Sequence, residues 1–317
     1  MKKHIRNFLL LTTLTTITIY AINKAISITS TMKNLLKTEH GRFYDWKYGK
    51  IFFTKTGKGS PVLLLHDLNP SSSSKEWDKI YKSLAKKHTV YTLDLLGCGR
   101  SDKPNLTYTN YLYVQLISDF IKDIIQEKTN IVSAGASGSF SVMACNMNPE
   151  YFNKLILINP EDLSKLAKIP NKQKNALKFL IEMPILGTFI YNIVYSSKNI
   201  EKNFNDNYYL RNNLISSNTL DVYYESAHLN NSRGKYLLSS IKSNYTNINI
   251  IHALAKVNNS IYIICSKEND WAEDLVNSYS NYNSSIEAAY VNHSKQLPQL
   301  ETPEELLKHL ELFLSSL

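Results

Sequence analysis

Stretches of apolar residues alternate along the chain with segments whose apolar residues recur at helical spacing. Strand-like stretches occupy residues 61–65, 88–93, 130–134, 154–158, 260–265 and 285–291, and helical spacing is seen in residues 76–85, 111–126 and 297–314. A stretch that is apolar at nearly every position is typical of a strand buried on both faces. Strands that alternate with helices predict an α/β protein with a mostly parallel sheet and helices on both faces. Residues 50–54 alternate apolar and polar positions, which predicts an outer antiparallel strand.

Residues 1–30 are a separate hydrophobic segment. Residues 8–22 carry no charge and follow a short basic start. The segment reaches the length that spans a bilayer only when it is extended to Ile28. We interpret it as a single-pass membrane anchor. The alternatives are a signal peptide of a secreted protein, with Ala25 and Ser27 as the small residues before the cut, and an ordinary amphipathic helix.

Composition narrows the class of protein further. The chain has 317 residues, of which 43% are apolar and 20% charged, so it can bury a full core. Its net charge of +9 is not gathered in a block, which favours a lysine-rich surface and no nucleic-acid partner. Cys98, Cys145 and Cys265 are far apart and have no metal-ligand spacing, so we expect small buried thiols and no metal or cofactor. Residues 30–48 are polar and predict a tether.

Residues 130–140 combine a short apolar strand, a tight glycine-containing turn and the start of a helix. A strand-to-helix turn of this kind can lift a nucleophilic side chain above a sheet. Three further motifs stand around it in order. His66 follows a buried strand, an Asp-x-x-Gly-x-Gly-Arg-Ser-Asp-x-Pro motif spans residues 94–104, and Asn-Pro-Glu occupies residues 148–150.

Together these motifs resemble the α/β-hydrolase superfamily, in its capped branch of esterases and epoxide hydrolases. The resemblance covers residues 45–160 and 258–317. It implies an α/β-hydrolase core formed by residues 31–160 and 258–317, with residues 161–257 as a helical cap over the active site. The cap is rich in tyrosine and phenylalanine, which we expect mainly to pack it onto the sheet.

The family's catalytic triad needs a nucleophile, a histidine base and a carboxylate that orients the base. Counting from the matched motifs places the nucleophile at Gly135, the acid at Asn269 and the base at Gln296. None of these side chains performs the required chemistry. The resemblance therefore implies a scaffold whose triad has been replaced. The epoxide-hydrolase and dehalogenase branches need an aspartate at the elbow, which is absent here.

A shifted triad is the alternative. Ser137, His293 and Asp270 lie close in sequence to the three expected positions. Glu161 or Asp162 is a further candidate for the acid. The objection is that two residues along a helical turn rotate a side chain by roughly 200°.

The remaining candidate site residues surround a predicted anion pocket. Backbone N–H groups of Ala136 and of the segment at Asp67 and Leu68 are expected to form it. Asp67 replaces a glycine of the family and brings a carboxylate near the pocket. The sequence thus predicts a membrane-anchored protein of this fold that binds a small apolar or acyl-like ligand or a partner. The alternative is a carboxylic-ester hydrolase that uses the shifted triad.

Overall fold

The computed structural model describes residues 2–38 and 40–315. One eight-stranded sheet runs through it, with strand order β1-β2-β4-β3-β5-β6-β7-β8. The pairs β1–β2 and β2–β4 are antiparallel and all other pairs are parallel, so the mostly parallel sheet expected from the sequence is confirmed. The strands are β1 (Gly41–Trp46), β2 (Gly49–Thr56), β3 (Pro61–Leu65), β4 (Thr89–Leu93), β5 (Thr129–Ala134), β6 (Phe152–Ile158), β7 (Ile261–Ser266) and β8 (Glu287–Val291).

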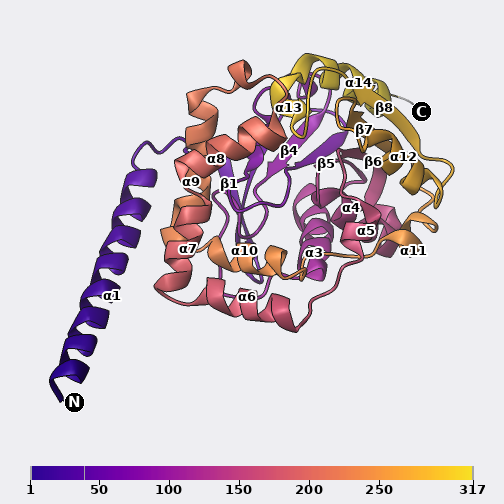
Figure 1. Ribbon diagram of the computed structural model, residues 1–317. Coiled ribbons are helices and arrows are strands. Elements are labelled where there is room, and N and C mark those ends of the chain that lie inside the picture. Colours follow the sequence, from indigo (N-terminus) through magenta and orange to yellow (C-terminus); the bar gives the residue numbers. More distant parts are fainter. Residues whose placement is uncertain (1, 39, 316–317) are drawn as a thin grey trace.

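Helices cover both faces of this sheet (Figure 1). Successive side chains of a strand point to opposite faces, so Leu63 and Val62 of β3 belong to different cores. Leu63 packs in the core beneath α3 (Asn110–Phe120), α4 (Ser137–Met147), α11 (Ile251–Leu254) and α12 (Ala272–Ser280). Val62 packs in the core beneath α2 (Tyr81–Leu84) and α14 (Pro303–Ser315).

Two predicted helices are divided in the structure. The segment predicted as one helix over residues 76–85 is a 3₁₀ turn, Ser74–Trp77, followed by the short α2. The last predicted helix is split into α13 (Pro298–Glu301) and α14, because Pro303 has no N–H to continue α13. The 3₁₀ turn lies in the loop after β3, and α13 lies in the loop after β8. Both loops are at the carboxyl ends of strands, where the site lies.

Between β6 and β7 the chain is helical, and the structure describes this stretch throughout. Before α11, the α-helices of this stretch are α5 (Leu163–Leu166), α6 (Lys172–Glu182), α7 (Leu186–Val194), α8 (Ser197–Asn203), α9 (Ser217–Ser232) and α10 (Lys235–Lys242). Their aromatic residues form a third core that includes Tyr191, Phe204 and Tyr223 and extends to Leu297 and Leu300 near α13. The rings therefore pack these helices onto the rest of the protein.

The N-terminal helix α1 (Lys2–Ser30) projects from the body (Figure 1). Its apolar side chains up to Ile22 are largely exposed, whereas Asn23, Ser27 and Ser30 are buried against the body. The tether predicted over residues 30–48 is only partly a linker, because Leu36 and Trp46 are buried although most of the segment is exposed. Buried Glu225 of α9 accepts the N–H groups that follow α1, and residues 41–46 form β1.

Candidate functional site

The turn between β5 and α4 has the backbone of a nucleophile elbow. Gly135 occupies its tip with φ +55°, in the left-handed region that glycine adopts without strain. Its N–H donates to the carbonyl of Ile158 at 3.0 Å, which fixes the turn against β6. The next residue, Ala136, precedes the first turn of α4 and directs its own N–H away from the helix. The turn is therefore built to present a side chain, but the residue at its tip has none.

Asp67 occupies the space in front of Gly135. A Cβ atom built on Gly135 would overlap the Asp67 carboxylate. No side chain fits at residue 135 while Asp67 keeps this position. Glycine at 135 and aspartate at 67 are thus sterically matched.

The same carboxylate fills the predicted anion pocket. Asp67 Oδ1 accepts the N–H of Ala136 at 2.9 Å and the N–H of Leu68 at 2.8 Å. One donor follows the elbow and the other lies in the loop after β3, which are the two sources of an oxyanion hole on this kind of scaffold. The chain's own carboxylate oxygen therefore takes the place that a substrate oxyanion would need.

The environment of Asp67 opposes its ionisation only in part. Burial raises the pKa of Asp67 to about 6, and the nearby charge of Glu161 adds to the rise. The N–H of Ala136 acts in the opposite direction, because it stabilises the charged form. Asp67 is consequently ionised above about pH 6 and protonated in more acidic solution.

A second carboxyl group, that of Glu76, lies close to the backbone of Asp67. Glu76 is fully buried and accepts a hydrogen bond from Tyr223 at 2.9 Å and a long one from the Asp67 N–H at 3.4 Å. Burial raises the pKa of Glu76 to about 7, and the charge of Asp67 contributes to the rise. Sequence reasoning missed Glu76, since a single glutamate in a polar turn gives no indication of burial.

The other two predicted triad positions carry no acid or base. Asn269 lies in the turn after β7, and its buried Nδ2 has no hydrogen-bond partner among the described residues. Gln296 is half-buried, with Nε2 at 3.5 Å from the carbonyl oxygen of Asn159. A buried amide group without a hydrogen-bond partner, such as that of Asn269, is costly.

Asn159, at the end of β6, holds the loop that carries Gln296. Its Nδ2 lies 3.1 Å from Ser266 Oγ, 3.0 Å from the carbonyl oxygen of Lys295 and 3.1 Å from that of Gln296. Its Oδ1 accepts the Ser266 N–H at 2.9 Å. One amide side chain thus joins the ends of two strands to the final loop. The sequence analysis did not single it out.

A profile of the alpha/beta hydrolase fold family matches residues 60–292. The chain belongs to the α/β-hydrolase-fold family. It is similar to 2-hydroxy-6-oxo-6-(2'-aminophenyl)hexa-2,4-dienoic acid hydrolase of Metapseudomonas resinovorans, with 29% identity over 113 residues, which are 35% of this chain and 39% of that protein. In the first curated relatives, the match spans between 34% and 39% of their length.

Solved α/β-hydrolase structures share the fold over a longer range. An epoxide hydrolase aligns with a TM-score of 0.71 and 16% identity, covering 87% of this chain and 98% of the other. A membrane phospholipase A aligns with a TM-score of 0.68 and 16% identity, covering 99% of this chain and 98% of the other. The second alignment extends over the range that includes α1.

The α/β-hydrolase elbow does not bring the residues of the shifted triad together here. Ser137 is fully buried, and its hydroxyl donates to the carbonyl of His66 at 2.6 Å. The imidazole of His293 is 73% exposed, with Nδ1 3.8 Å from Glu268 Oε1. Asp270 is exposed in the turn after β7. No hydrogen bond joins these three side chains within the described residues.

The two further acid candidates also have other partners. Glu161 forms an ion pair with Lys165 at 2.5 Å. Asp162 caps α5 by accepting the N–H groups of Ser164 and Lys165. Of these two residues, only Glu161 influences the elbow, through its charge on Asp67.

His66 has a structural role in this α/β-hydrolase site. Its Nε2 accepts the Leu95 N–H at 3.0 Å, so Nδ1 carries the proton that is donated to the Asp67 carbonyl at 2.7 Å. Burial lowers the pKa of His66, which keeps the ring neutral. The ring ties the loop that carries Asp67 to the end of β4.

Tyrosines from the helical stretch between β6 and β7 contact the loop that carries Asp67. Tyr195 donates its hydroxyl to Asn69 Oδ1 at 3.0 Å, and Asn69 Nδ2 lies 3.4 Å from the Tyr208 hydroxyl. Asn69 is two residues after Asp67, so these contacts hold the loop beside the elbow. Asp67, Asn69, Tyr208 and Gln296 each remain partly exposed. Among the described residues no group of three or more His, Cys, Asp or Glu is placed to hold a metal ion.

Proposed function

We propose that this protein is a membrane-anchored α/β-hydrolase-fold protein that binds rather than hydrolyses. The observation that carries the proposal is the Asp67 carboxylate, whose Oδ1 accepts both N–H groups of the oxyanion pocket. Acyl transfer builds negative charge on an oxygen in that pocket, and preorganised donors there supply a large part of catalysis. With the donors already bound to an anion, an ester carbonyl has no place to be polarised.

The replaced triad supports the same function. Gly135 offers no nucleophile, Gln296 accepts no proton near neutral pH, and Asn269 carries no charge to orient a base. Loss of one triad member alone lowers turnover by several powers of ten. Here the loss of the triad is combined with a filled oxyanion pocket. Both are obstacles to the same reaction.

For the ligand, we propose a small apolar or acyl-like molecule, or a partner, that reaches the partly exposed residues under the cap. Asn69, Tyr208 and Gln296 provide polar groups beside the aromatic core of the cap. A combination of polar groups and aromatic side chains is typical of ligand sites. The structural likeness to a membrane phospholipase A favours a lipid-derived molecule.

For the N-terminus, we propose a single-pass anchor. The helix Lys3–Ser30 is long and apolar enough to cross a membrane, and its most apolar part is not buried in the protein. The end of α1 is packed on the cap: Asn23 Nδ2 donates to the Ile185 carbonyl at 3.0 Å, and Asn192 Nδ2 donates to Asn23 Oδ1 at 2.9 Å. A cut near Ala25 or Ser27 would remove these contacts, which supports an uncleaved anchor over a signal peptide.

Fluorophosphonate labelling tests the proposal. The folded full-length protein in detergent is expected to remain unlabelled. The triad-restoring variant with Gly135→Ser, Asn269→Asp and Gln296→His is also expected to remain unlabelled, because Asp67 still fills the pocket. Labelling is expected only when Asp67→Gly is added to those three changes.

The alternative, a carboxylic-ester hydrolase with a Ser137, His293 and Asp270 triad, predicts the opposite result. It requires labelling of the unmodified protein that disappears in Ser137→Ala and in His293→Ala. That result would replace the proposed function.

Mass spectrometry of lipids released from the purified protein by denaturation identifies the bound molecule, with the detergent-washed membrane extract as control.

A further inference from the structure

Helix α6 is arranged with its apolar residues outward. Leu177, Phe179 and Leu180 are 37%, 72% and 39% exposed. Lys178 instead turns toward the protein, where its ammonium group pairs with Glu182 at 2.6 Å, and Ile181 is buried. Lys172, Gln173 and Asn175 of the same helix are exposed as well, so its outer face combines large apolar and polar side chains. The apolar part of this face is suited to an apolar neighbour.

The apolar surface continues on both sides of α6. Ile169, just before the helix, is 76% exposed, and Leu186, at the start of α7, is 40% exposed. Lys168 and Lys172 are exposed at the same end as Ile169. We call this set, Ile169, Leu177, Phe179, Leu180 and Leu186 with the two lysines, the α6 face.

The position of α6 relative to α1 is fixed by α7. Helix α7 holds the end of α1 through Asn23 and Asn192, and α6 meets α7 at a bend of 98°. In Figure 1, α7 lies beside the upper part of α1, and α6 crosses the lower edge of the body, on the side toward which the free part of α1 extends. If α1 enters a bilayer, α6 consequently lies across the direction of entry, facing the membrane surface.

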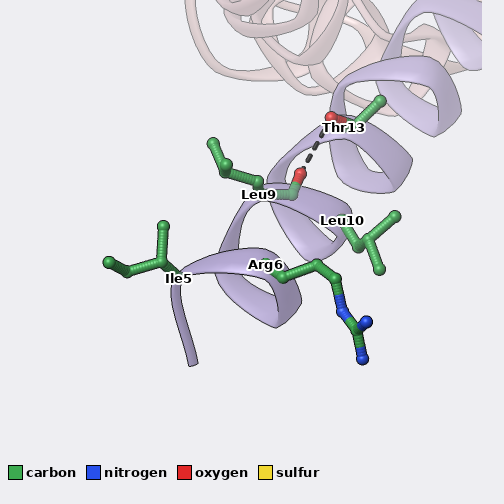
Figure 2. A pocket seen from close by; sticks show the side chains of 5 residues that line it. All are labelled: Ile5, Arg6, Leu9, Leu10 and Thr13. Atoms are coloured by element: carbon green, nitrogen blue, oxygen red, sulfur yellow. Dashed lines mark hydrogen bonds between the residues drawn. The ribbon is translucent and has the colours of Figure 1, made fainter. Parts of the chain in front are cut away.

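The free part of α1 has the character that this arrangement requires. Ile5, Leu9 and Leu10 stand outward from the helix, and the Thr13 hydroxyl donates to the Leu9 carbonyl at 2.8 Å (Figure 2). A threonine whose hydroxyl is bonded within its own helix can face lipid without leaving a polar group unpaired.

We propose that the α6 face docks on the surface of the bilayer that α1 enters, with α6 lying in the plane of the membrane interface. Helices of this kind bury apolar residues among the acyl chains and place lysines at anionic headgroups. Phe179, Leu180 and Leu177 form the inserted side, and Lys168 and Lys172 face the headgroups. This proposal rests on the proposed anchor. It adds a second membrane contact, which fixes the orientation of the cap.

Spin-label accessibility tests the docking in the full-length chain. The three native cysteines are fully buried, so an introduced surface cysteine is labelled selectively. Spin labels are attached to the introduced cysteine of four variants, which are Phe179→Cys, Leu180→Cys, Leu14→Cys in α1 and Leu312→Cys in α14. Each labelled protein is reconstituted in bilayer discs of phosphatidylcholine with a minority of phosphatidylglycerol. All four original side chains are exposed, so the substitutions leave packing intact. Collision rates with oxygen, which enriches in lipid, and with a polar nickel complex, which stays in water, are then compared.

The expected result is a several-fold higher oxygen-to-nickel ratio at residues 179 and 180 than at residue 312, which serves as the aqueous control. A high ratio at residue 14 together with an aqueous ratio at 179 and 180 would overturn the docking and leave the anchor in place. An aqueous ratio at residue 14 would overturn the anchor and with it the docking. Shielding of residue 179 from both reagents, increasing with the number of protein copies per disc, would assign the α6 face to a second copy and also overturn the proposal.

Discussion

The carboxylate of Asp67 lies where a side chain on Gly135 would have to be placed, and it accepts the N–H of Ala136, the residue that follows. Two positions 68 residues apart in sequence therefore depend on each other. A nucleophile at residue 135 excludes the observed position of Asp67, and Asp67 in that position excludes a nucleophile. The Asp67 carboxylate of the protein itself thus occupies the site, where its Oδ1 accepts the N–H groups of Leu68 and Ala136.

The first prediction concerns Gly135→Ser. The new side chain would overlap the Asp67 carboxylate and would also adopt a φ of +55°, which is unfavourable for serine. Overpacking of this kind costs about 1–3 kcal/mol. We expect the free energy of unfolding to fall by that amount, and chemical denaturation of the detergent-solubilised protein measures it.

The control is a double-mutant cycle with Asp67→Gly. Removal of the carboxylate leaves room for the serine side chain, so the steric part of the cost of Gly135→Ser should disappear in the Asp67→Gly background, whereas the cost of the left-handed backbone remains. Coupling between contacting residues reaches about 0.5–3 kcal/mol. Additive effects of the two substitutions would contradict the steric relationship.

The second prediction concerns pH. The pKa of Glu76, about 7, lies above its ordinary value of 4.5, because burial disfavours the charged form. The folded state therefore holds a proton that the unfolded state releases between about pH 4.5 and 7. Stability gained from Glu76 is fully present below about pH 4.5 and is lost as the pH rises through 7, at about 1.4 kcal/mol for each unit of pKa difference.

Glu76→Gln provides the measurement for this relationship. A neutral amide does not titrate, so we expect the decline of the free energy of unfolding between pH 5 and 8 to become shallower. Asp67→Asn should flatten the same curve over a more acidic range, because the pKa of Asp67 is raised only to about 6. Identical pH profiles for Glu76→Gln and the unmodified protein would show that Glu76 does not hold a proton in the folded state.

The elbow illustrates how much of this site could be predicted from sequence. The motif spacing located Gly135 and the loop containing Asp67 and Leu68, and it indicated a carboxylate near the anion pocket. It did not indicate that Asp67 Oδ1 accepts both N–H groups, since that depends on the direction of one side chain between two loops. Local sequence specifies the turn, whereas the contact across it is set by tertiary structure.

Buried polar residues mark the other limit of the sequence analysis. Glu76 stands among polar residues in the sequence and Asn159 directly follows an apolar strand, and both are buried in the structure. Periodicity identifies the apolar face of an element but not a polar residue that is covered by a distant segment. Glu76, for example, is covered by Tyr223 and Gln299, which are far along the chain.

The third prediction compares Ser137 with His293. The Ser137 hydroxyl is buried and bonded to the His66 carbonyl, so Ser137→Ala should cost about 1 kcal/mol of unfolding free energy. The His293 ring is exposed, so His293→Ala should change stability by no more than about 0.5 kcal/mol. Thermal or chemical denaturation distinguishes these effects. A catalytic pair would instead show both variants with near-normal stability and a shared loss of ester hydrolysis.

The fourth prediction concerns the segment that joins α1 to the body. Glu225 is fully buried and accepts the N–H groups of Leu35 and Leu36 at 2.9 and 3.1 Å. In Glu225→Gln one acceptor oxygen becomes an NH₂ group that faces an N–H, which leaves a buried donor unpaired at a cost of about 1–3 kcal/mol. Because that cost favours local opening, trypsin should cleave at Lys33 or Lys37 roughly tenfold faster and release α1 from the body.

Asp221→Asn removes only the exposed ion pair with Lys33 and should leave the cleavage rate nearly unchanged. Equal rates for both variants would mean that Glu225 does not hold the segment, and that other contacts, such as those of Asn23 and Ser27 with α7 and α9, hold α1 on the body.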